Sequence, residues 1–222
     1  MQLHSPLLFA ALLIPVMLGC AAEVPQSRDQ DEMTDTSEFI EWVEQLDADL
    51  DREFDSYNVN ADGEITYIDL QEAQITDNDL SRLVGLKQLE ELNICGNEIS
   101  DEGLIHIAQL TTLQYLDLSF THITDDGLQH LQRLTNLQSL LLNGLDDDDQ
   151  LTDAGIRYLV PLVQLSELRL NGAHITDQSV DALLTFRNLR MLDISGTRIS
   201  EEGYRRLREG LPDCDIERHS VT

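Results

Sequence analysis

Basic and aromatic residues are scarce in this chain, and it has no apolar run long enough to cross a bilayer. The 222 residues include 14 Lys and Arg against 42 Asp and Glu, giving a net charge of −28 at pH 7. Such a charge argues against a nucleic-acid backbone or an anionic membrane face as the partner. Cations and basic proteins remain plausible partners.

Catalytic motifs are also missing from the sequence. It contains no P-loop, no His-Glu-x-x-His, no nucleophile elbow and no Cys/His spacing typical of a metal site. We therefore expect no enzymatic activity and no cofactor.

The longest apolar run extends from Pro6 to Leu18. At about 13 residues it is shorter than the roughly 20 that a membrane span needs, so it indicates a secretory signal. With Gly19-Cys20 behind it, it resembles a bacterial lipoprotein signal, in which the cysteine is lipid-modified. The resemblance implies a signal peptide over residues 1–20, lipidation of Cys20 and a place in the cell envelope. A plain secretory signal cut after Ala22 and a cytoplasmic protein are the alternatives.

A repeat fills most of the remaining chain. Its leading apolar position recurs at steps of 24, 24, 24, 28 and 24 residues, at Ile65, Leu89, Leu113, Leu137, Leu165 and Leu189. Within the second repeat, Leu92 and Ile94 have strand spacing, whereas Leu104 and Ile107 have helix spacing. Ser100 lies between them as a helix N-cap, and the acids that follow it complement the helix dipole.

These units, with their Leu-x-x-Leu-x-Leu strand segments and Ile-Thr-Asp turns, resemble the leucine-rich-repeat family, in its ribonuclease-inhibitor-like class. The form is similar to repeats of F-box-associated proteins and their bacterial relatives, but no F-box-like segment is visible and the export signal argues against such an adaptor. The resemblance implies an α/β fold, a right-handed solenoid with parallel strands on its concave face and helices on its convex face. Of the family's asparagine ladder only Asn97 survives; Ala73, Thr121, Ala173 and Thr197 stand at the equivalent positions.

The repeats occupy residues 63–211, followed by a C-terminal cap and tail over 212–222. Residues 21–36 are polar and acidic and predict a flexible linker. Residues 37–62 predict an N-terminal cap, a helix followed by a β-hairpin. The segment 58–69 also resembles an EF-hand loop, through Asn58, Asn60, Asp62, Gly63 and Asp69. The hairpin is favoured because the same segment must supply the first repeat's strand.

The candidate binding residues are the side chains that point outward from the predicted strands, on the concave face, and one neighbour. Aromatic and aliphatic anchors in an acidic surround suit a protein partner; a merely solvated sheet surface is the alternative. The candidates are Tyr67, Glu91, Tyr115, Asp117, Phe120, Leu141, Glu167 and Arg169.

The fourth repeat carries four extra residues, which include Asp146, Asp147, Asp148 and Asp149. They could bind a hard cation such as calcium, with His122 and His174 on either side as pH-responsive neighbours. A tolerated acidic loop is the simpler interpretation. Cys95 and Cys214 should lie about 20 Å apart, beyond the reach of a disulfide.

We therefore expect a monomeric, non-enzymatic protein-interaction scaffold at the cell envelope, attached to the membrane only through its lipid. The alternative is a calcium- or pH-responsive structural protein that uses the Asp146–Asp149 loop or the segment 58–69.

Overall fold

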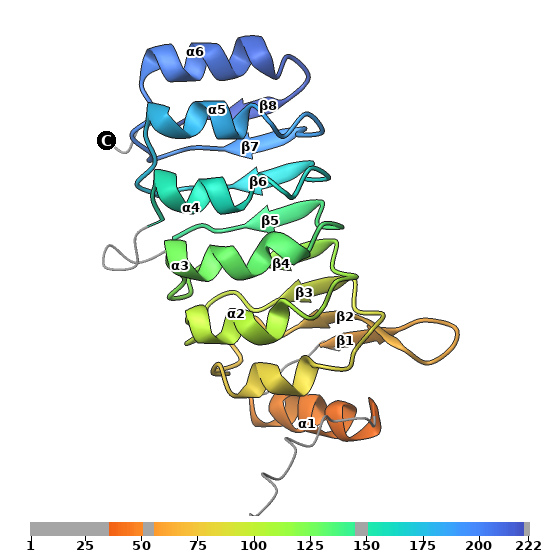
Figure 1. The fold of residues 1–222 in the computed structure, drawn as a ribbon. Helices are drawn as coiled ribbons and strands as arrows, with labels where there is room; N and C mark the ends of the chain where they lie inside the picture. The colour runs from red at the N-terminus through yellow and green to blue at the C-terminus, as the bar shows by residue number, and fades with distance from the viewer. Residues whose placement is uncertain (1–35, 51–55, 145–150, 220–222) are drawn as a thin grey trace, which may run out of the picture. The chain divides into compact units, whose positions relative to one another are not determined.

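A computed structural model describes residues 36–50, 56–144 and 151–219. They all lie within Glu32–Thr222, one of two structural units of the chain. Their strands form one sheet in the order β1 to β8, in which β1 and β2 pair antiparallel and all later neighbours pair parallel (Figure 1). The strands are β1 (Tyr57–Val59), β2 (Ile65–Asp69), β3 (Glu91–Asn93), β4 (Tyr115–Asp117), β5 (Ser139–Leu141), β6 (Glu167–Arg169), β7 (Met191–Asp193) and β8 (Asp215–Glu217).

The helical segments from η1 to α6 connect successive parallel strands and lie together on one side of the sheet, whereas α1 precedes β1 (Figure 1). Several are 3₁₀ turns, in which each residue rises about 2.0 Å and covers more length than in an α-helix. No described helix has the length and apolarity to cross a membrane. The segments are α1 (Thr36–Asp49), η1 (Asp79–Leu83), α2 (Asp101–Ile107), α3 (Asp125–Leu128), η2 (Gln129–Arg133), α4 (Asp153–Tyr158), η3 (Asp177–Ser179), α5 (Val180–Leu183) and α6 (Glu201–Gly210).

The repeat leucines form the core between the sheet and the helices. Leu92, Leu116 and Leu140 are in register on neighbouring strands and are fully buried. Leu104 and Ile107 of α2 are fully buried on the helical side of the same core. Each such side chain stabilises the fold by about 1.5–3 kcal/mol through burial, so the predicted leucine columns are structural.

The predicted helix caps are confirmed. Ser100 precedes α2 in extended conformation, and its hydroxyl accepts the backbone N–H of Glu102. The same kind of cap precedes α3, α4, η3 and α6, at Thr124, Thr152, Thr176 and Ser200.

Aspartates at the helix starts also join each repeat to the next. One carboxylate oxygen of Asp101 accepts the backbone N–H of Thr124 (2.9 Å), and the other accepts its hydroxyl (2.6 Å). We call this series the aspartate ladder; it also joins Asp77 to Ser100, Asp125 to Thr152, Asp153 to Thr176 and Asp177 to Ser200. Gly127 is required beside it, because a Cβ there would collide with the Asp101 carboxylate. The sequence predicted these acids only as partners of the helix dipole.

The asparagine ladder is discontinuous, as predicted. The aspartate ladder therefore supplies hydrogen bonds between repeats that an asparagine ladder would otherwise make. The Asn97 amide donates to the carbonyls of Leu70 and Ile94 (both 2.8 Å), and its oxygen accepts the N–H of Ile75. Threonine makes only a local bond at the equivalent position, where Thr121 donates to Leu118 O.

A helix and a hairpin cover the N-terminal end of the core. Phe39 and Val43 of α1 are buried in it, and β1 pairs with β2 as the predicted hairpin. The EF-hand interpretation of residues 58–69 is not what the structure has, since a strand follows the turn where an EF-hand would continue as a helix. The side chain of Asn60 instead accepts the N–H groups of Asp62 and Glu64.

Candidate functional site

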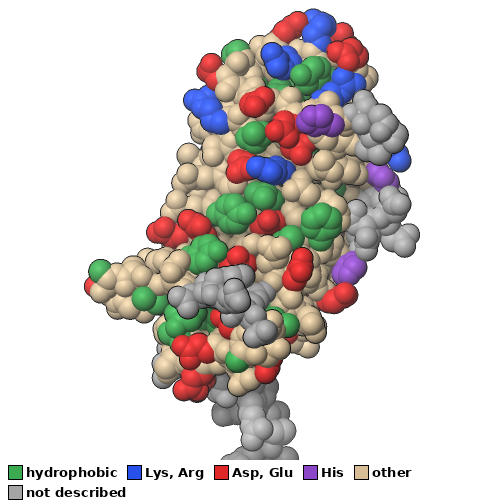
Figure 2. Space-filling view, turned by 180° about the vertical axis from the view of Figure 1, so that it is seen from behind, with side chains coloured by type: hydrophobic (Ala, Val, Ile, Leu, Met, Phe, Trp, Pro, Cys, Tyr) green, Lys and Arg blue, Asp and Glu red, His purple; other side chains and the backbone are tan. Residues whose placement is uncertain are grey.

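The outward side chains of β2 to β8 lie on the side of the sheet opposite the helices. We call these 14 positions the open sheet face; it corresponds to the predicted concave face. Seven positions are acidic, two are tyrosine and one is basic: Tyr67, Asp69, Glu91, Asn93, Tyr115, Asp117, Ser139, Leu141, Glu167, Arg169, Met191, Asp193, Asp215 and Glu217. Figure 2 views the unit from the side opposite to Figure 1 and shows hydrophobic side chains among acidic ones, with most Lys and Arg near the C-terminal end of the stack.

Strand register brings seven of the eight predicted binding residues together in two rows. Tyr67, Glu91, Tyr115, Ser139 and Glu167 are successive partners in the first row. In the second row, Asp117, Leu141 and Arg169 are successive partners on β4 to β6. Because neighbouring strands lie about 4.8 Å apart, the two rows form one continuous surface. Whether a partner binds there stays a prediction.

The single basic residue of the open sheet face is already paired. Arg169 Nε donates to Glu167 Oε1 at 2.7 Å, and the Ser139 hydroxyl donates to Glu167 Oε2 at 2.7 Å. Sequence reasoning placed both charged residues on the face without detecting this pair. Its consequence is that Arg169 does not offset the remaining carboxylates.

Several side chains of the second row bind the backbone. The side-chain oxygens of Asp69, Asn93, Asp117 and Asp193 each accept the N–H two residues further on, at 2.8–3.0 Å. This turn stabilises the strand end. The column changes to Leu141 and Arg169 on β5 and β6, where a side chain cannot make that bond. The middle of the face therefore lacks these turns, and its side chains are largely buried: Asp117 is 8% exposed, and Ser139 and Leu141 are 9% exposed.

Burial and nearby carboxylates raise the pKa values of three titratable groups on or beside the open sheet face. Burial first, and then the charges of Asp117, Glu72 and Asp69, raise the pKa of the Cys95 thiol to about 11. Burial and then nearby carboxylates likewise raise the pKa of Tyr115 and the pKa of Tyr67. At neutral pH the thiol and both phenols are protonated, so Cys95 is a weak nucleophile.

Phe120, the eighth predicted residue, follows β4 at the edge of the open sheet face. Its backbone is in the left-handed region (φ 56°), and its side chain is 62% exposed. Of the equivalent positions in the other repeats, four hold glycine (Gly96, Gly144, Gly172 and Gly196) and the first holds Glu72, which is also left-handed (φ 53°). A bulky residue costs about 1–2 kcal/mol in this conformation, and strain of this kind is often found at functional sites. The ring lies over Gly144, where an added Cβ would collide with it.

The predicted metal and lipid positions lie in parts of the chain that the structure does not describe. Asp146–Asp149 and Cys20 lie outside the described residues, so calcium binding and lipidation stay predictions. Within the described ranges, no three His, Cys, Asp or Glu side chains are arranged to hold a metal ion. His122 contacts Glu98 (3.1 Å), and the buried Nδ1 of His174 has no hydrogen-bond partner among those residues.

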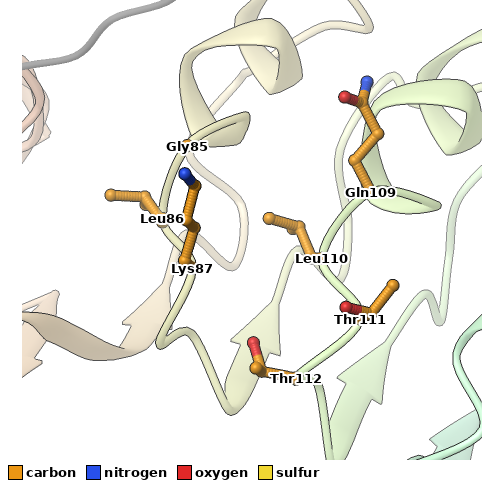
Figure 3. A pocket seen from close by; sticks show the side chains of 7 residues that line it. All are labelled: Gly85, Leu86, Lys87, Gln109, Leu110, Thr111 and Thr112. Atoms are coloured by element: carbon orange, nitrogen blue, oxygen red, sulfur yellow. The ribbon is translucent and has the colours of Figure 1, made fainter.

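A hollow of about 220 Å³ lies elsewhere, between the turns that lead into β3 and β4 (Figure 3). Lys87 is its one charged lining residue, and the Thr112 hydroxyl donates a hydrogen bond to the carbonyl of Leu89 (2.7 Å). It is formed by successive repeat turns and brings no group of reactive side chains together.

Comparison with known proteins identifies which folds this architecture resembles. Residues 87–108 and 109–131 each match the profile of a family described as Leucine Rich repeat. Internalin C2 from Listeria monocytogenes is similar in structure, with a TM-score of 0.50 and 23% identity, covering 70% of this chain and 73% of its own. That likeness shows the fold, and the predicted leucine-rich-repeat solenoid is confirmed. No curated protein sequence matches the chain.

Two further solved structures are longer proteins. For an internalin, InlF, from Listeria monocytogenes, the TM-score is 0.47 at 21% identity, covering 64% of this chain and 45% of that one. For a leucine-rich-repeat protein from Leptospira interrogans, the TM-score is 0.44 at 24% identity, covering 61% and 38%. This chain therefore spans less than half the length of either.

Proposed function

We propose that this chain is a non-enzymatic protein-binding scaffold of the cell envelope, and that it binds its partner through the open sheet face. The observation that carries the proposal is the pair of rows on β4 to β6. They place Tyr115 and Leu141 within an acidic surround, at the point where the turn-forming side chains of the second row are interrupted.

Phe120 supports the same surface. A large apolar side chain that stays 62% exposed gains little from folding, and its left-handed backbone adds a cost. Binding would bury the ring, and aromatic residues are frequent energetic anchors of interfaces. The strain is therefore explained if the ring contacts a partner.

Site-specific photocrosslinking tests this surface. The photoreactive residue p-benzoylphenylalanine replaces Phe120 in one variant and Ile105 in another, and the full chain is made in its own cells. Ile105 is a matched control because it is also exposed (51%) but lies on α2, on the helical side of the sheet. We expect a discrete crosslinked protein from position 120 only. Equal yields from both positions, or none from position 120, would overturn the proposal.

The envelope location rests on the N-terminal segment. Metabolic labelling with a fatty acid should mark the parent chain and not a Cys20→Ser variant. Unlabelled but exported parent would favour the plain secretory alternative, whereas unlabelled parent retained in the cytoplasm would remove the envelope role.

A further inference from the structure

Charge is divided unevenly along the chain. Residues 36–186 contain 30 acidic residues against six basic ones, whereas residues 187–222 contain seven of each. The arginines of the C-terminal part are largely engaged: Arg205 contacts Glu202 and Glu209, Arg206 contacts Asp181, and Arg218 contacts Glu201. The strongest negative field therefore belongs to the earlier repeats, which carry most of the open sheet face.

The face itself has the same imbalance. Seven of its 14 positions are carboxylates, and its only guanidinium, Arg169, is held by Glu167. Carboxylates of neighbouring strands are not separated by cations on β2 to β4, where Asp69, Glu91 and Asp117 lie. Like charges at this spacing repel one another, so a cationic occupant would relieve the repulsion.

Asp117 carries the inference beyond a general acidic surface. Its side chain is only 8% exposed, and one oxygen accepts the N–H of Ser119 (2.8 Å). No described residue donates to the other oxygen, Oδ2. Oδ2 is not among the buried unpaired polar atoms of the described residues, so it reaches the surface and is open to a donor from outside, whereas the rest of the side chain is shielded from water. Folding has therefore already removed part of the water that the Asp117 carboxylate would have to lose on binding a cation.

The apolar neighbours of Asp117 indicate which kind of cationic partner would bind there. Leu141 is next to Asp117 on the adjacent strand, and Tyr115 lies two residues before Asp117 on the same strand. A bare metal ion would make no favourable contact with the apolar surface of these groups. A protein segment can place a basic side chain at Asp117 and an apolar side chain beside it. The distance from β2 to β6 is about 19 Å, which about six residues of extended chain would cross.

We propose that the partner presents an extended cationic segment of protein, with a Lys or Arg side chain at Asp117 and an apolar side chain against Leu141. This inference rests on the proposed function, since it names the partner chemistry for the same face. The raised pKa values of Cys95 and Tyr115 agree with the negative field that such a segment would meet.

A peptide titration tests the inference directly. The probe is a fluorescent peptide of about ten residues with Lys at alternate positions, one central Leu and Ser elsewhere, measured by anisotropy against the purified full chain at about 0.15 M salt. Two comparison peptides carry Gln or Glu in place of Lys. We expect the Lys peptide to bind at least about tenfold more tightly than the Gln peptide, and the Glu peptide not to bind.

A matched pair of variants separates a seated side chain from general attraction to an acidic protein. Asp117→Asn keeps an oxygen for the Ser119 N–H but removes the charge, whereas Asp126→Asn removes an exposed charge on α3, on the helical side. We expect about a tenfold loss for Asp117→Asn and no change for Asp126→Asn. Equal effects of the two variants would overturn the inference, as would displacement of the peptide by spermine at equal charge concentration.

Three outcomes keep this inference distinct from the proposed function. A crosslink from position 120 that survives Asp117→Asn unchanged would retain the scaffold and remove the cationic segment. No crosslink would remove the scaffold itself. A dimer in sedimentation that Asp117→Asn abolishes would make a second copy the occupant and overturn the inference.

Discussion

The aspartate ladder and the open sheet face are both rich in acids, but their carboxylates are used differently. In the ladder, both oxygens of Asp101 are taken by the next repeat, through Thr124. On the face, one oxygen of Asp117 is taken by the backbone and the other is left without a donor among the described residues. Residue type and charge are the same in both places. The two sets of carboxylates differ in the number of partners that each already has.

The largest expected effect is on stability, from breaking the ladder. Asp125→Ala removes the acceptors of both the N–H and the hydroxyl of Thr152, which are partly buried. Leaving such donors unpaired should lower the free energy of unfolding by about 2–3 kcal/mol, measured by urea denaturation. Asp126→Ala, one residue away and exposed, is the control and should cost less than about 0.5 kcal/mol. If the two variants were equally stable, the ladder would have no energetic role.

A smaller effect is expected where Phe120 meets Gly144. Gly144→Ala adds a Cβ against the ring at a positive φ (61°) and should destabilise the protein by about 1–3 kcal/mol. In a Phe120→Gly background the steric part of this cost should disappear. Phe120→Gly alone should leave the protein as stable as the parent or more so, since it removes the left-handed strain. Additive losses in thermal denaturation of the double variant would contradict the described contact.

Low pH should weaken the hydrogen bonds of the aspartate ladder by protonating its carboxylates. Burial alone would raise the pKa of Asp153, but hydrogen bonds from Ser179 and Thr176 outweigh it and hold the pKa below its usual value. Hydrogen bonds from Ser200 also lower the pKa of Asp177. A carboxylate with a lowered folded-state pKa stabilises the protein above its unfolded pKa of about 3.9, and that contribution is lost as pH falls through the folded value.

The melting temperature should therefore fall as the pH is taken from about 5 to about 2, measured by circular dichroism. Asp153→Asn should reduce the slope of that fall, and Asp126→Asn should not. An unchanged slope in Asp153→Asn would mean that other groups are responsible.

The smallest expected effect is on the reaction rate of Cys95, which follows β3 beside the open sheet face. With a pKa of about 11, Cys95 should react with iodoacetamide at pH 8 on the order of a hundredfold more slowly than a free thiol. Asp117→Asn should increase the rate by removing a nearby negative charge, and Asp126→Asn should leave it unchanged. A peptide map identifies the labelled cysteine, and a rapid reaction in the parent would contradict the described surroundings.

The features predicted correctly depend on short sequence patterns. Strand spacing at Leu92 and Ile94, helix caps such as Ser100 and the hairpin turn at Gly63 are each decided within a few residues. The leucine columns then fix the register, because a shift would expose the core. The two rows of the face follow from the same alternation, so seven candidate residues could be brought together from sequence alone.

The features that were missed join residues far apart in sequence or depend on backbone conformation. The ladder connects residues 23 to 27 positions apart, so its aspartates look like ordinary helix-start acids. The Arg169–Glu167 pair depends on side-chain geometry that spacing does not define. The conformation of Phe120 did leave a signal, since aligning the repeats places it in a column of glycines at Gly96, Gly144 and Gly172.

The aspartate ladder also has a direction. In every pair the acceptor precedes its donor along the chain, from Asp77 and Ser100 to Asp177 and Ser200. During synthesis the N-terminal part of a protein emerges from the ribosome first. Each newly made repeat would therefore find its acceptor already presented by the repeat before it. The order of these bonds matches vectorial, repeat-by-repeat folding of the nascent chain.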